Sequence, residues 1–178
     1  KDIGVIESII IGWVISEGHL GKDKCIISQV NKKVLINLKN LVEFYYGKCN
    51  AKIYPDKLAF KLVLPNIFVS YFNNRFDIPL GKKSRLIRIP KQIIGGNSEI
   101  KHAFLAAYIE GDGTFSHDNS KYLKRPRISI TTYSKQFAED CNSLFHSLGY
   151  TAHIYKSKIY ENKISFHRSD NISKFYMY

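Results

Sequence analysis

The 178-residue sequence contains few cysteines, and their spacing is not that of disulfide-rich or zinc-binding proteins. Its three cysteines, Cys25, Cys49 and Cys141, are odd in number and widely spaced, and no CxxC pair occurs. A disulfide framework or a structural zinc site is therefore not expected. Cys141 falls within an apolar helical pattern and is predicted to be a small core residue.

Long apolar runs are also missing. No stretch of 18 or more apolar residues occurs, so the sequence predicts no transmembrane helix. The short apolar segment 9–15 is followed at once by Ser16, Glu17 and Gly18, which is not the pattern of a signal peptide either.

Acidic residues are scarce relative to basic ones. The chain has 27 Lys and Arg against 15 Asp and Glu, a net charge of +12. Residues 1–73 carry +4, residues 74–97 carry +5 and residues 98–178 carry +3. A basic surface alone suits a merely soluble protein as well as a polyanion-binding one, but charge spread along the whole chain favours an extended partner, nucleic acid first.

The chain is internally repeated. Four segments of the first half recur in the same order in the second half: 10–18 with 105–113, 27–41 with 130–144, 51–57 with 152–158, and 66–72 with 171–177, at offsets of 95, 103, 101 and 105 residues. One such match can arise by chance, whereas four in register indicate a duplicated structural unit.

Hydrophobic periodicity predicts the same elements in each copy, in the order αββαββα. An α+β fold is expected, with copies at 1–73 and 98–178, each an antiparallel four-stranded sheet packed on helices. Residues 74–97, rich in Pro, Gly and basic charge, are predicted to be a linker. The expected apolar helices cover about 3–16 and about 98–111; the expected strands include Cys25–Gln29, Arg127–Thr132, Ala51–Tyr54 with Leu58–Leu64, and Ala152–Tyr155 with Ile164–His167.

Alternation along these strands predicts one apolar and one basic sheet face. Leu58, Phe60, Leu62 and Leu64 share a face, with Lys57 and Lys61 on the other. In the second copy Lys163 opposes Ile164 and Phe166, and Arg125 and Arg127 share a face with Ser129 and Thr131. Such a sheet needs helices on one side and suits an anion on the other, although a solvated face is the alternative interpretation.

Each apolar helix carries a stripe of small residues at four-residue spacing. The stripes are Ser8, Gly12 and Ser16 in the first copy, and Ala103, Ala107 and Gly111 in the second. Small-xxx-small stripes allow two helix backbones to approach closely. We therefore expect the copies to dock helix against helix about a pseudo-twofold axis, rather than each helix packing only on its own sheet.

An acidic residue followed by glycine ends each of these helices: Glu17-Gly18 and Asp112-Gly113. The glycines are expected to be helix C-caps. Repulsion between a carboxylate at that position and the negative pole of the helix costs about 0.3–1 kcal/mol. Bringing two such helix ends together places two carboxylates beside two negative poles. A hard divalent cation, most simply Mg²⁺, would resolve this repulsion, and such a metal can activate water at a phosphodiester.

The segments IIGWVISEG (10–18) and LAAYIEGDG (105–113) resemble the two copies of the LAGLIDADG motif, and RIPKQIIGG (88–96) resembles the segment that precedes the second copy in that family. The resemblance covers essentially the whole chain. It implies a monomeric, intracellular homing endonuclease that cuts both strands of a long, nearly asymmetric DNA site. Carried over, the eighth motif position places the metal, Mg²⁺ or another hard cation such as Mn²⁺ or Ca²⁺, on Glu17 and Asp112.

The sequence departs from the family pattern in two places. The sixth motif position is acidic only in the second copy, where Glu110 stands opposite Ile15. The family also places polar and basic residues near the metals: Gln29 and Lys33 occupy such positions in the first copy, but Thr132 and Gln136 replace them in the second. Arg168, Lys61 and Lys158 are the candidates for a basic partner in the second copy. The residues expected to contact DNA are Lys57, Lys61, Arg125, Arg127, Lys158, Lys163 and Arg168.

Two alternative functions keep the same fold: an RNA-splicing maturase, and a DNA-binding protein that has lost nuclease activity. Intact acids in both copies argue against the second. A form embedded in a self-splicing protein is not expected, because no Cys or Ser starts the sequence and no His-Asn pair ends it. The six histidines lie beside no nucleophile motif, so a Ser/His or Cys/His hydrolase is not expected.

Overall fold

The structure is a computed structural model. It describes the backbone of residues 2–120, 123–155 and 162–166, and the surroundings of side chains in 2–116 and 128–155. None of the described helices is both long enough and apolar enough to cross a membrane.

The described chain folds as two α+β copies joined by a connecting segment. Each copy holds an antiparallel four-stranded sheet, and the strand orders, β1-β2-β4-β3 and β5-β6-β8-β7, are equivalent. The first copy consists of α1 (Val5–Ser16), β1 (Gly18–Leu20), β2 (Cys25–Gln29), α2 (Lys32–Tyr46), β3 (Lys52–Asp56), β4 (Ala59–Leu64) and α3 (Asn66–Phe76). The connection contains α4 (Lys91–Ile94), and the second copy consists of α5 (Ser98–Asp112), β5 (Gly113–Ser120), β6 (Leu123–Thr132), α6 (Lys135–Ser147), β7 (Ala152–Tyr155) and β8 (Asn162–Phe166).

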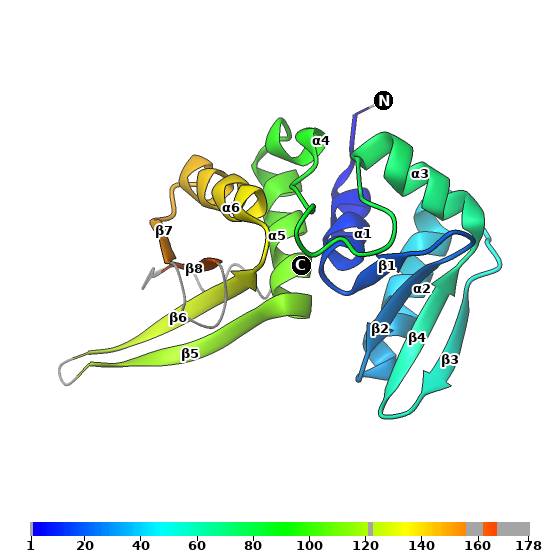
Figure 1. Ribbon diagram of the computed structural model, residues 1–178, viewed down its shortest axis with the longest axis horizontal. Helices are drawn as coiled ribbons and strands as arrows, with labels where there is room; N and C mark the ends of the chain where they lie inside the picture. Colours follow the sequence, from blue (N-terminus) through cyan, green and yellow to red (C-terminus); the bar gives the residue numbers. More distant parts are fainter. Residues whose placement is uncertain (1, 121–122, 156–161, 167–178) are drawn as a thin grey trace.

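The helices α1 and α5 lie side by side at the centre of the molecule, with one sheet on either side of them (Figure 1). Each sheet is covered on one face by helices of its own copy, α2 and α3 in the first and α6 in the second. No helix among the described residues covers the other face of either sheet. The duplicated sequence therefore builds a central helix pair between two sheets, as the repeat predicted.

Several predicted elements match the structure closely, and the hairpin of the first copy corrects one of them. The strands Cys25–Gln29 and Ala152–Tyr155 are confirmed. Leu58, however, is not part of the apolar face, because it lies in the β3–β4 turn and is 91% exposed. Lys57 beside it adopts a left-handed conformation, φ 51°, which closes the hairpin between Asp56 and Ala59. Strand β4 therefore begins only at Ala59, and its buried face consists of Leu62 and Leu64.

The connection between the copies is better packed than a solvated linker. Helix α3 runs to Phe76, and the following segment buries four isoleucines in the core: Ile78, Ile87, Ile89 and Ile93. The helix expected to close the second copy, over 171–177, lies outside the described residues. Cys141 is a buried core residue, as predicted.

A buried carboxylate in α1 is a feature that the sequence did not reveal. Glu7 is 1% exposed and accepts hydrogen bonds from three tyrosine hydroxyls, those of Tyr45 (3.1 Å), Tyr46 (2.9 Å) and Tyr71 (2.5 Å). The guanidinium of Arg75 lies 3.5 Å from the same carboxylate. A buried charge is tolerated only when it is paired and hydrogen-bonded, so this cluster fixes α1 against α2 and α3 of its own copy.

Candidate active site

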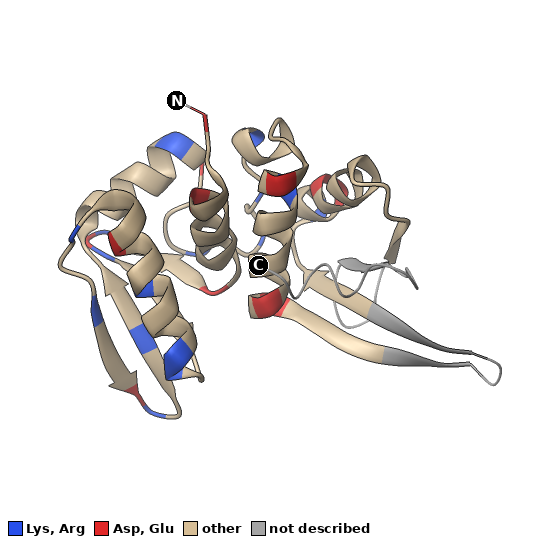
Figure 2. Ribbon diagram, turned by 180° about the vertical axis from the view of Figure 1, so that it is seen from behind, with Lys and Arg blue, Asp and Glu red and all other residues tan. Residues whose placement is uncertain are grey.

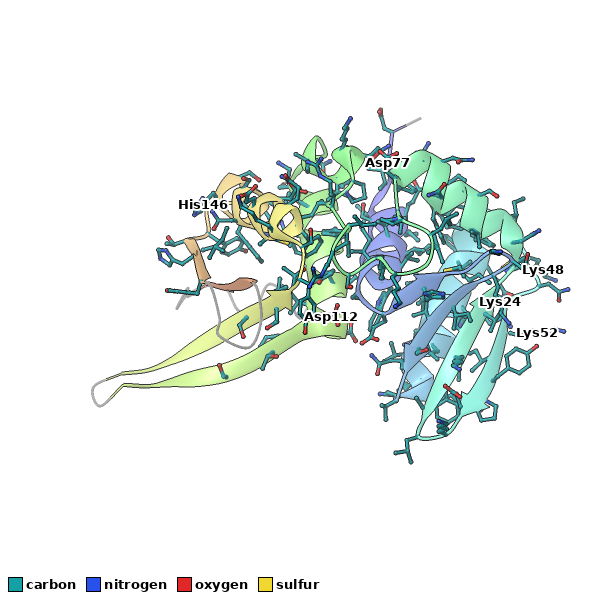
Figure 3. The ribbon with its side chains drawn as sticks, viewed as in Figure 1. Lys24, Lys48, Lys52, Asp77, Asp112 and His146 are labelled. Carbon is teal, nitrogen blue, oxygen red and sulfur yellow. The ribbon has the colours of Figure 1, made fainter. Side chains whose placement is uncertain are left out.

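The two predicted acids converge where the central helices end. Glu17 is the C-cap of α1, and Asp112 is the last residue of α5. Figure 2 shows acidic residues at adjacent ends of these helices, and Figure 3 places Asp112 at the end of α5 that faces the space between the sheets. A Cβ added to Gly111 would lie 3.1 Å from Cγ of Glu17, so the acidic end of each helix reaches the other.

The stripes of small residues make this approach possible. A Cβ added to Gly12 would lie 2.8 Å from both Cβ of Ala107 and the carbonyl oxygen of Phe104. A Cβ on Gly111 would lie 2.4 Å from Oγ of Ser16. Both distances are too short for any side chain, so helix-on-helix docking is confirmed in the part of the chain that the structure describes.

The prediction that both glycines after the acids are helix C-caps is confirmed for Gly113 and wrong for Gly18. Gly113 is the C-cap of α5, but the C-cap of α1 is Glu17 and Gly18 already belongs to β1. Neither glycine has a left-handed backbone. A Cβ on Gly18 would lie 2.3 Å from the carbonyl oxygen of Val14, and one on Gly113 would lie 2.4 Å from that of Ile109. Glycine is needed because the chain turns back directly over the last helical turn.

The carboxyls occupy an unfavourable electrostatic position. Burial raises the pKa of Glu17 above its ordinary value, and the nearby Asp112 carboxylate raises it further. Burial by the packed helix ends likewise raises the pKa of Asp112, although the residue keeps contact with solvent. The ammonium of Lys83 and a hydrogen bond from the Tyr108 hydroxyl oppose that rise. Burial of both carboxyls and the effect of Asp112 on Glu17 thus disfavour two negative charges at this position.

Lys83, from the connection between the copies, places a cation near both carboxyls. Its Nζ donates hydrogen bonds to the carbonyl oxygens of Val14 (2.7 Å) and Ile15 (2.5 Å), and lies 3.4 Å from that of Ser16. These carbonyls are the unsatisfied acceptors at the end of α1. Burial lowers the pKa of Lys83 to about 8, while the carboxylates of Asp112 and Glu17 oppose this fall.

Residues 99–177 match the LAGLIDADG-like domain, a match that contains Asp112 and all of α5 except its first residue. The second copy of the chain is therefore similar to a LAGLIDADG-like domain. In structure it is similar to the homing endonuclease I-DmoI in complex with DNA and Mn, with a TM-score of 0.65 and 17% identity over 96% of this chain and 93% of that one. It is also similar to the homing endonuclease I-WcaI bound to its DNA recognition sequence, with a TM-score of 0.63 and 15% identity over 99% and 81% of the two chains.

Among curated proteins, the chain is similar to segments of two much longer ones. It is 28% identical to the DNA polymerase of Thermococcus aggregans over 152 residues, which is 78% of this chain but 7% of the polymerase. It is 30% identical to the replication factor C small subunit of Methanocaldococcus jannaschii over 139 residues, which is 73% of this chain and again 7% of the relative. The chain thus spans less than a tenth of the length of either protein, and the likeness concerns one segment of each.

The two acids of the second LAGLIDADG motif have different surroundings. Asp112 lines a pocket of about 160 Å³ together with Tyr108 and Lys83. Glu110 does not line this pocket, although partial burial raises the pKa of its carboxyl as well. Its counterpart in the first motif, Ile15, is a core residue with 1% exposure. Position eight of each motif, and not position six, therefore carries the paired acids.

The four polar residues predicted near the motifs are placed as follows. Gln29 ends β2, and its Oε1 accepts a hydrogen bond from the Val30 amide (2.8 Å), while Lys33 is exposed in the first turn of α2. Thr132 lines the same pocket as Asp112, whereas Gln136 donates to Asp140 (3.1 Å). The structure thus places Thr132 at the site, whereas Gln136 forms a hydrogen bond within α6.

The predicted DNA-contacting residues are only partly described. Lys61 lies on the helix-free face of the first sheet, where its Nζ pairs with Asp56 at 2.7 Å. Lys57 is exposed in the hairpin turn rather than on the strand face. The side chains of Arg125, Arg127, Lys158, Lys163 and Arg168 lie outside the described part of the chain.

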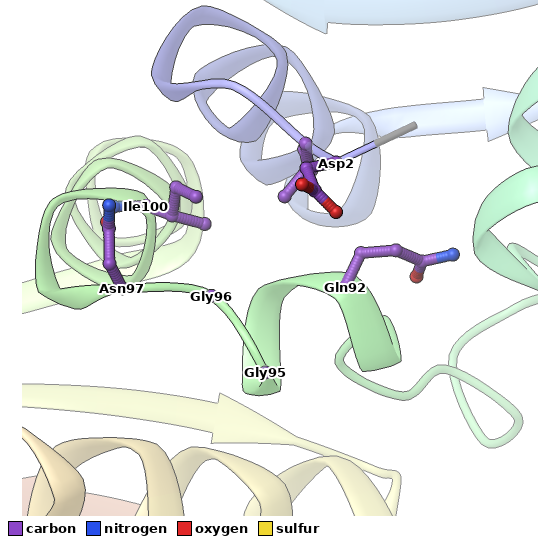
Figure 4. Close-up of a pocket in the computed structure, with 7 residues that line it drawn as sticks. Asp2, Gln92, Gly95, Gly96, Asn97 and Ile100 are labelled. Atoms are coloured by element: carbon purple, nitrogen blue, oxygen red, sulfur yellow. The ribbon is translucent and has the colours of Figure 1, made fainter.

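A larger pocket, of about 550 Å³, lies at the opposite ends of the central helices (Figure 4). Residues around the starts of α1 and α5 line it, among them Asp2, Gln92 and Asn97. It is a full helix length from the two carboxylates and takes no part in the site described above.

The raised pKa values give a stability prediction. A carboxyl whose pKa is higher in the folded than in the unfolded state makes the protein less stable as pH rises through that interval. We therefore expect Asp112→Asn to raise the melting temperature of metal-free protein at pH 7. Relief of about 0.3–1 kcal/mol corresponds to roughly 1–4 °C for a chain of this size.

Thermal unfolding in chelator-treated buffer checks this, with Asp23→Asn in an exposed turn as the control. A melting temperature that falls in Asp112→Asn, but not in the control, would contradict the unfavourable electrostatics. Addition of Mn²⁺ should then stabilise the wild-type protein more than the variant.

Proposed function

We propose that this chain is a site-specific DNA endonuclease that cuts both strands of a duplex with divalent metal bound at the interface of its two copies. The observation that carries the proposal is the convergence of Glu17 and Asp112 at the adjacent ends of α1 and α5, between two sheets that each have one face covered by none of the described helices. A duplex presents two antiparallel strands, and a duplicated protein can offer each of them an equivalent carboxylate.

The donor set fits a hard divalent metal. No cluster of three or more His, Cys, Asp or Glu side chains occurs in the described residues, which disfavours a closed structural metal site. Mg²⁺ is commonly held by only one or two carboxylates, with waters and substrate phosphates as the remaining ligands. Bound by Glu17 and Asp112, such a metal would supply Lewis acidity and an activated water at the phosphodiester.

The chain's own residues prepare this position. The Tyr108 hydroxyl holds the Asp112 carboxylate by a hydrogen bond, and Lys83 holds the end of α1 that carries Glu17. Glu17 and Asp112 are therefore oriented before substrate arrives, which lowers the entropy cost of assembling the site. The solved homing endonucleases of this fold whose complexes contain DNA and Mn support the same assignment.

The proposal is tested in two stages. Randomised duplexes are first selected for binding in Ca²⁺, and the selected duplexes are then incubated with Mg²⁺ or Mn²⁺ while nicked and linear products are quantified. We expect metal-dependent double-strand cleavage at one position of a recovered duplex. Recovery of duplexes that no metal causes to be cut would favour a nuclease-inactive DNA-binding protein, and preference for structured RNA would favour a maturase.

Binding should depend steeply on salt, because both sheets would neutralise phosphates of one long site. Each phosphate neutralised contributes about −0.9 to the slope of log K against log salt concentration. We expect Lys57→Ala and Lys61→Ala each to weaken binding and to reduce that slope by about one unit.

Fluorescence anisotropy at several salt concentrations measures both quantities. The matched control is Lys91→Ala, an exposed lysine in α4 on the side of the 550 Å³ pocket. A wild-type slope near −1 or −2 would refute an extended footprint. Unchanged affinity and slope in both Lys57→Ala and Lys61→Ala would refute the assigned sheet surface.

A further inference from the structure

The connection between the copies is bound to both of them. At one point Nζ of Lys83 donates to the carbonyl oxygens of Val14 and Ile15 at the end of α1, in the first copy. Six residues later the amide of Ile89 donates to Oδ2 of Asp140 in α6, in the second copy (3.2 Å). Figure 1 shows this part of the chain crossing the central helices between α3 and α4.

The residues between these two anchors are also fixed. The carbonyl oxygen of Lys83 accepts hydrogen bonds from the amides of Leu86 (2.8 Å) and Ile87 (2.9 Å), which closes a turn. The carbonyl oxygen of Ile87 accepts one from Oγ of Ser134, the N-cap of α6 (2.7 Å). Residues 83–89, named the strap below, thus form a hydrogen-bonded bridge from α1 to α6.

Asp140 is built into its place in this bridge. Its side chain is 9% exposed, and its Oδ1 accepts a hydrogen bond from Gln136 (3.1 Å). Nε of Arg88, in the strap, lies 3.7 Å from Oδ2. The carboxylate is therefore oriented from its own helix and holds the strap through both a backbone amide and a charged side chain.

The strap also forms one wall of the candidate active site. The 160 Å³ pocket that Asp112 and Tyr108 line from α5 is closed on another side by Lys83, Ser84 and Ile87. A displacement of the strap would change this pocket directly, and would release the ammonium that holds the end of α1.

We propose that the strap positions the two carboxylates, with Asp140 as a positioning residue that acts on the Glu17 end of α1 through Lys83. The role rests on the proposed endonuclease function, because it concerns the geometry of the same site. Its distinctive consequence is that a change in α6 of the second copy alters the end of α1 in the first.

The experiment compares Asp140→Ala, Asp140→Asn, Lys83→Met and the double variant Asp140→Ala/Lys83→Met. The control is Glu139→Ala, whose carboxylate in the same helix pairs with Lys135 at 3.5 Å and is exposed. Asp140→Ala should slow single-turnover cleavage by about tenfold to a hundredfold, the effect of a misplacement on the order of 1 Å, while the Kd for DNA stays within about twofold. Asp140→Asn keeps an acceptor for the Ile89 amide and should recover most of the rate.

The double variant separates positioning from general destabilisation. If Asp140 acts through Lys83, Asp140→Ala should add nothing to the loss already present in Lys83→Met. Additive losses, or cleavage by Asp140→Ala equal to that of Glu139→Ala, would overturn the proposal.

A second measurement does not depend on cleavage. Hydrogen exchange of the amides of residues 15–17 should be faster in Asp140→Ala than in Glu139→Ala, since the strap no longer secures the end of α1. If the wild-type protein cuts no DNA but this exchange difference is present, the proposed endonuclease function is wrong and the proposed positioning role of the strap is supported. Equal exchange in the two variants would overturn the strap even if the enzyme is active.

Discussion

Asp112→Asn and Glu17→Gln should each leave DNA binding intact and abolish double-strand cleavage. Both substitutions keep the shape of the side chain while removing the charge that a hard divalent cation requires. Loss of the Lewis acid and of the activated water should lower the cleavage rate by about a thousandfold, the upper end of the range seen when one electrostatic group of an active site is removed. Binding should persist, because the sheets and not the helix ends would contact most phosphates.

Glu110→Gln is the matched control for this prediction. Glu110 lies two residues before Asp112 in the same motif, but two residues correspond to about 200° of rotation on a helix, so the two side chains point in different directions. Its counterpart in the first copy is the buried Ile15, so no equivalent acid could serve the other DNA strand. We expect Glu110→Gln to retain most of the wild-type cleavage.

Plasmid cleavage with separate quantification of nicked and linear products measures all three variants. If metal is shared between the strands, Asp112→Asn and Glu17→Gln each stop both cuts. If each carboxylate serves one strand, each variant becomes a nickase of opposite strand preference. Full double-strand cleavage by Asp112→Asn, or complete loss in a folded Glu110→Gln, contradicts the assignment of the paired acids.

The parts of this molecule that the sequence predicted are those that depend on local periodicity or on the duplication. Strand Cys25–Gln29 follows from its apolar residues, and the docking of α1 on α5 follows from the matched positions of Gly12 and Ala107. The pairing of Glu17 with Asp112 needed only the offset of 95 residues. Tyr108 stands one helical turn before Asp112, a spacing that could have suggested its hydrogen bond.

The residues that the sequence did not predict depend on contacts between distant parts of the chain. Lys83 binds carbonyl groups 68 and 69 residues earlier, and backbone carbonyls leave no trace in a sequence. Glu7 sits in an apolar helix and is satisfied by hydroxyls 38, 39 and 64 residues away. The prediction that Leu58 lies on the apolar face of the strand was wrong for a different reason. The left-handed turn at Lys57 keeps Leu58 out of β4, although the alternation of apolar residues had included it.

Gly111→Ala should reduce cleavage much more than it reduces DNA affinity. The added methyl would lie 2.4 Å from Oγ and 2.8 Å from Cβ of Ser16, so the ends of α1 and α5 must separate. Overpacking of this kind typically costs about 1–3 kcal/mol of stability, and a displacement on the order of 1 Å can cost about a hundredfold in rate. Gly12→Leu, farther from the carboxylates but at an equally close contact, should destabilise the protein more strongly.

The control for the added methyl is Gly21→Ala, because a Cβ there would meet nothing closer than 3.4 Å and the backbone is not left-handed. Gly111→Ala should be partly rescued by Ser16→Gly, which removes both atoms that the new methyl would strike. The rescue distinguishes a steric effect at the helix interface from a change in the flexibility of α5, since Ser16 belongs to the other copy. Wild-type cleavage by Gly111→Ala and Gly12→Leu would refute close docking, whereas rescue of the rate by Ser16→Gly would show that the separation of the two helix ends sets the geometry of the carboxylates.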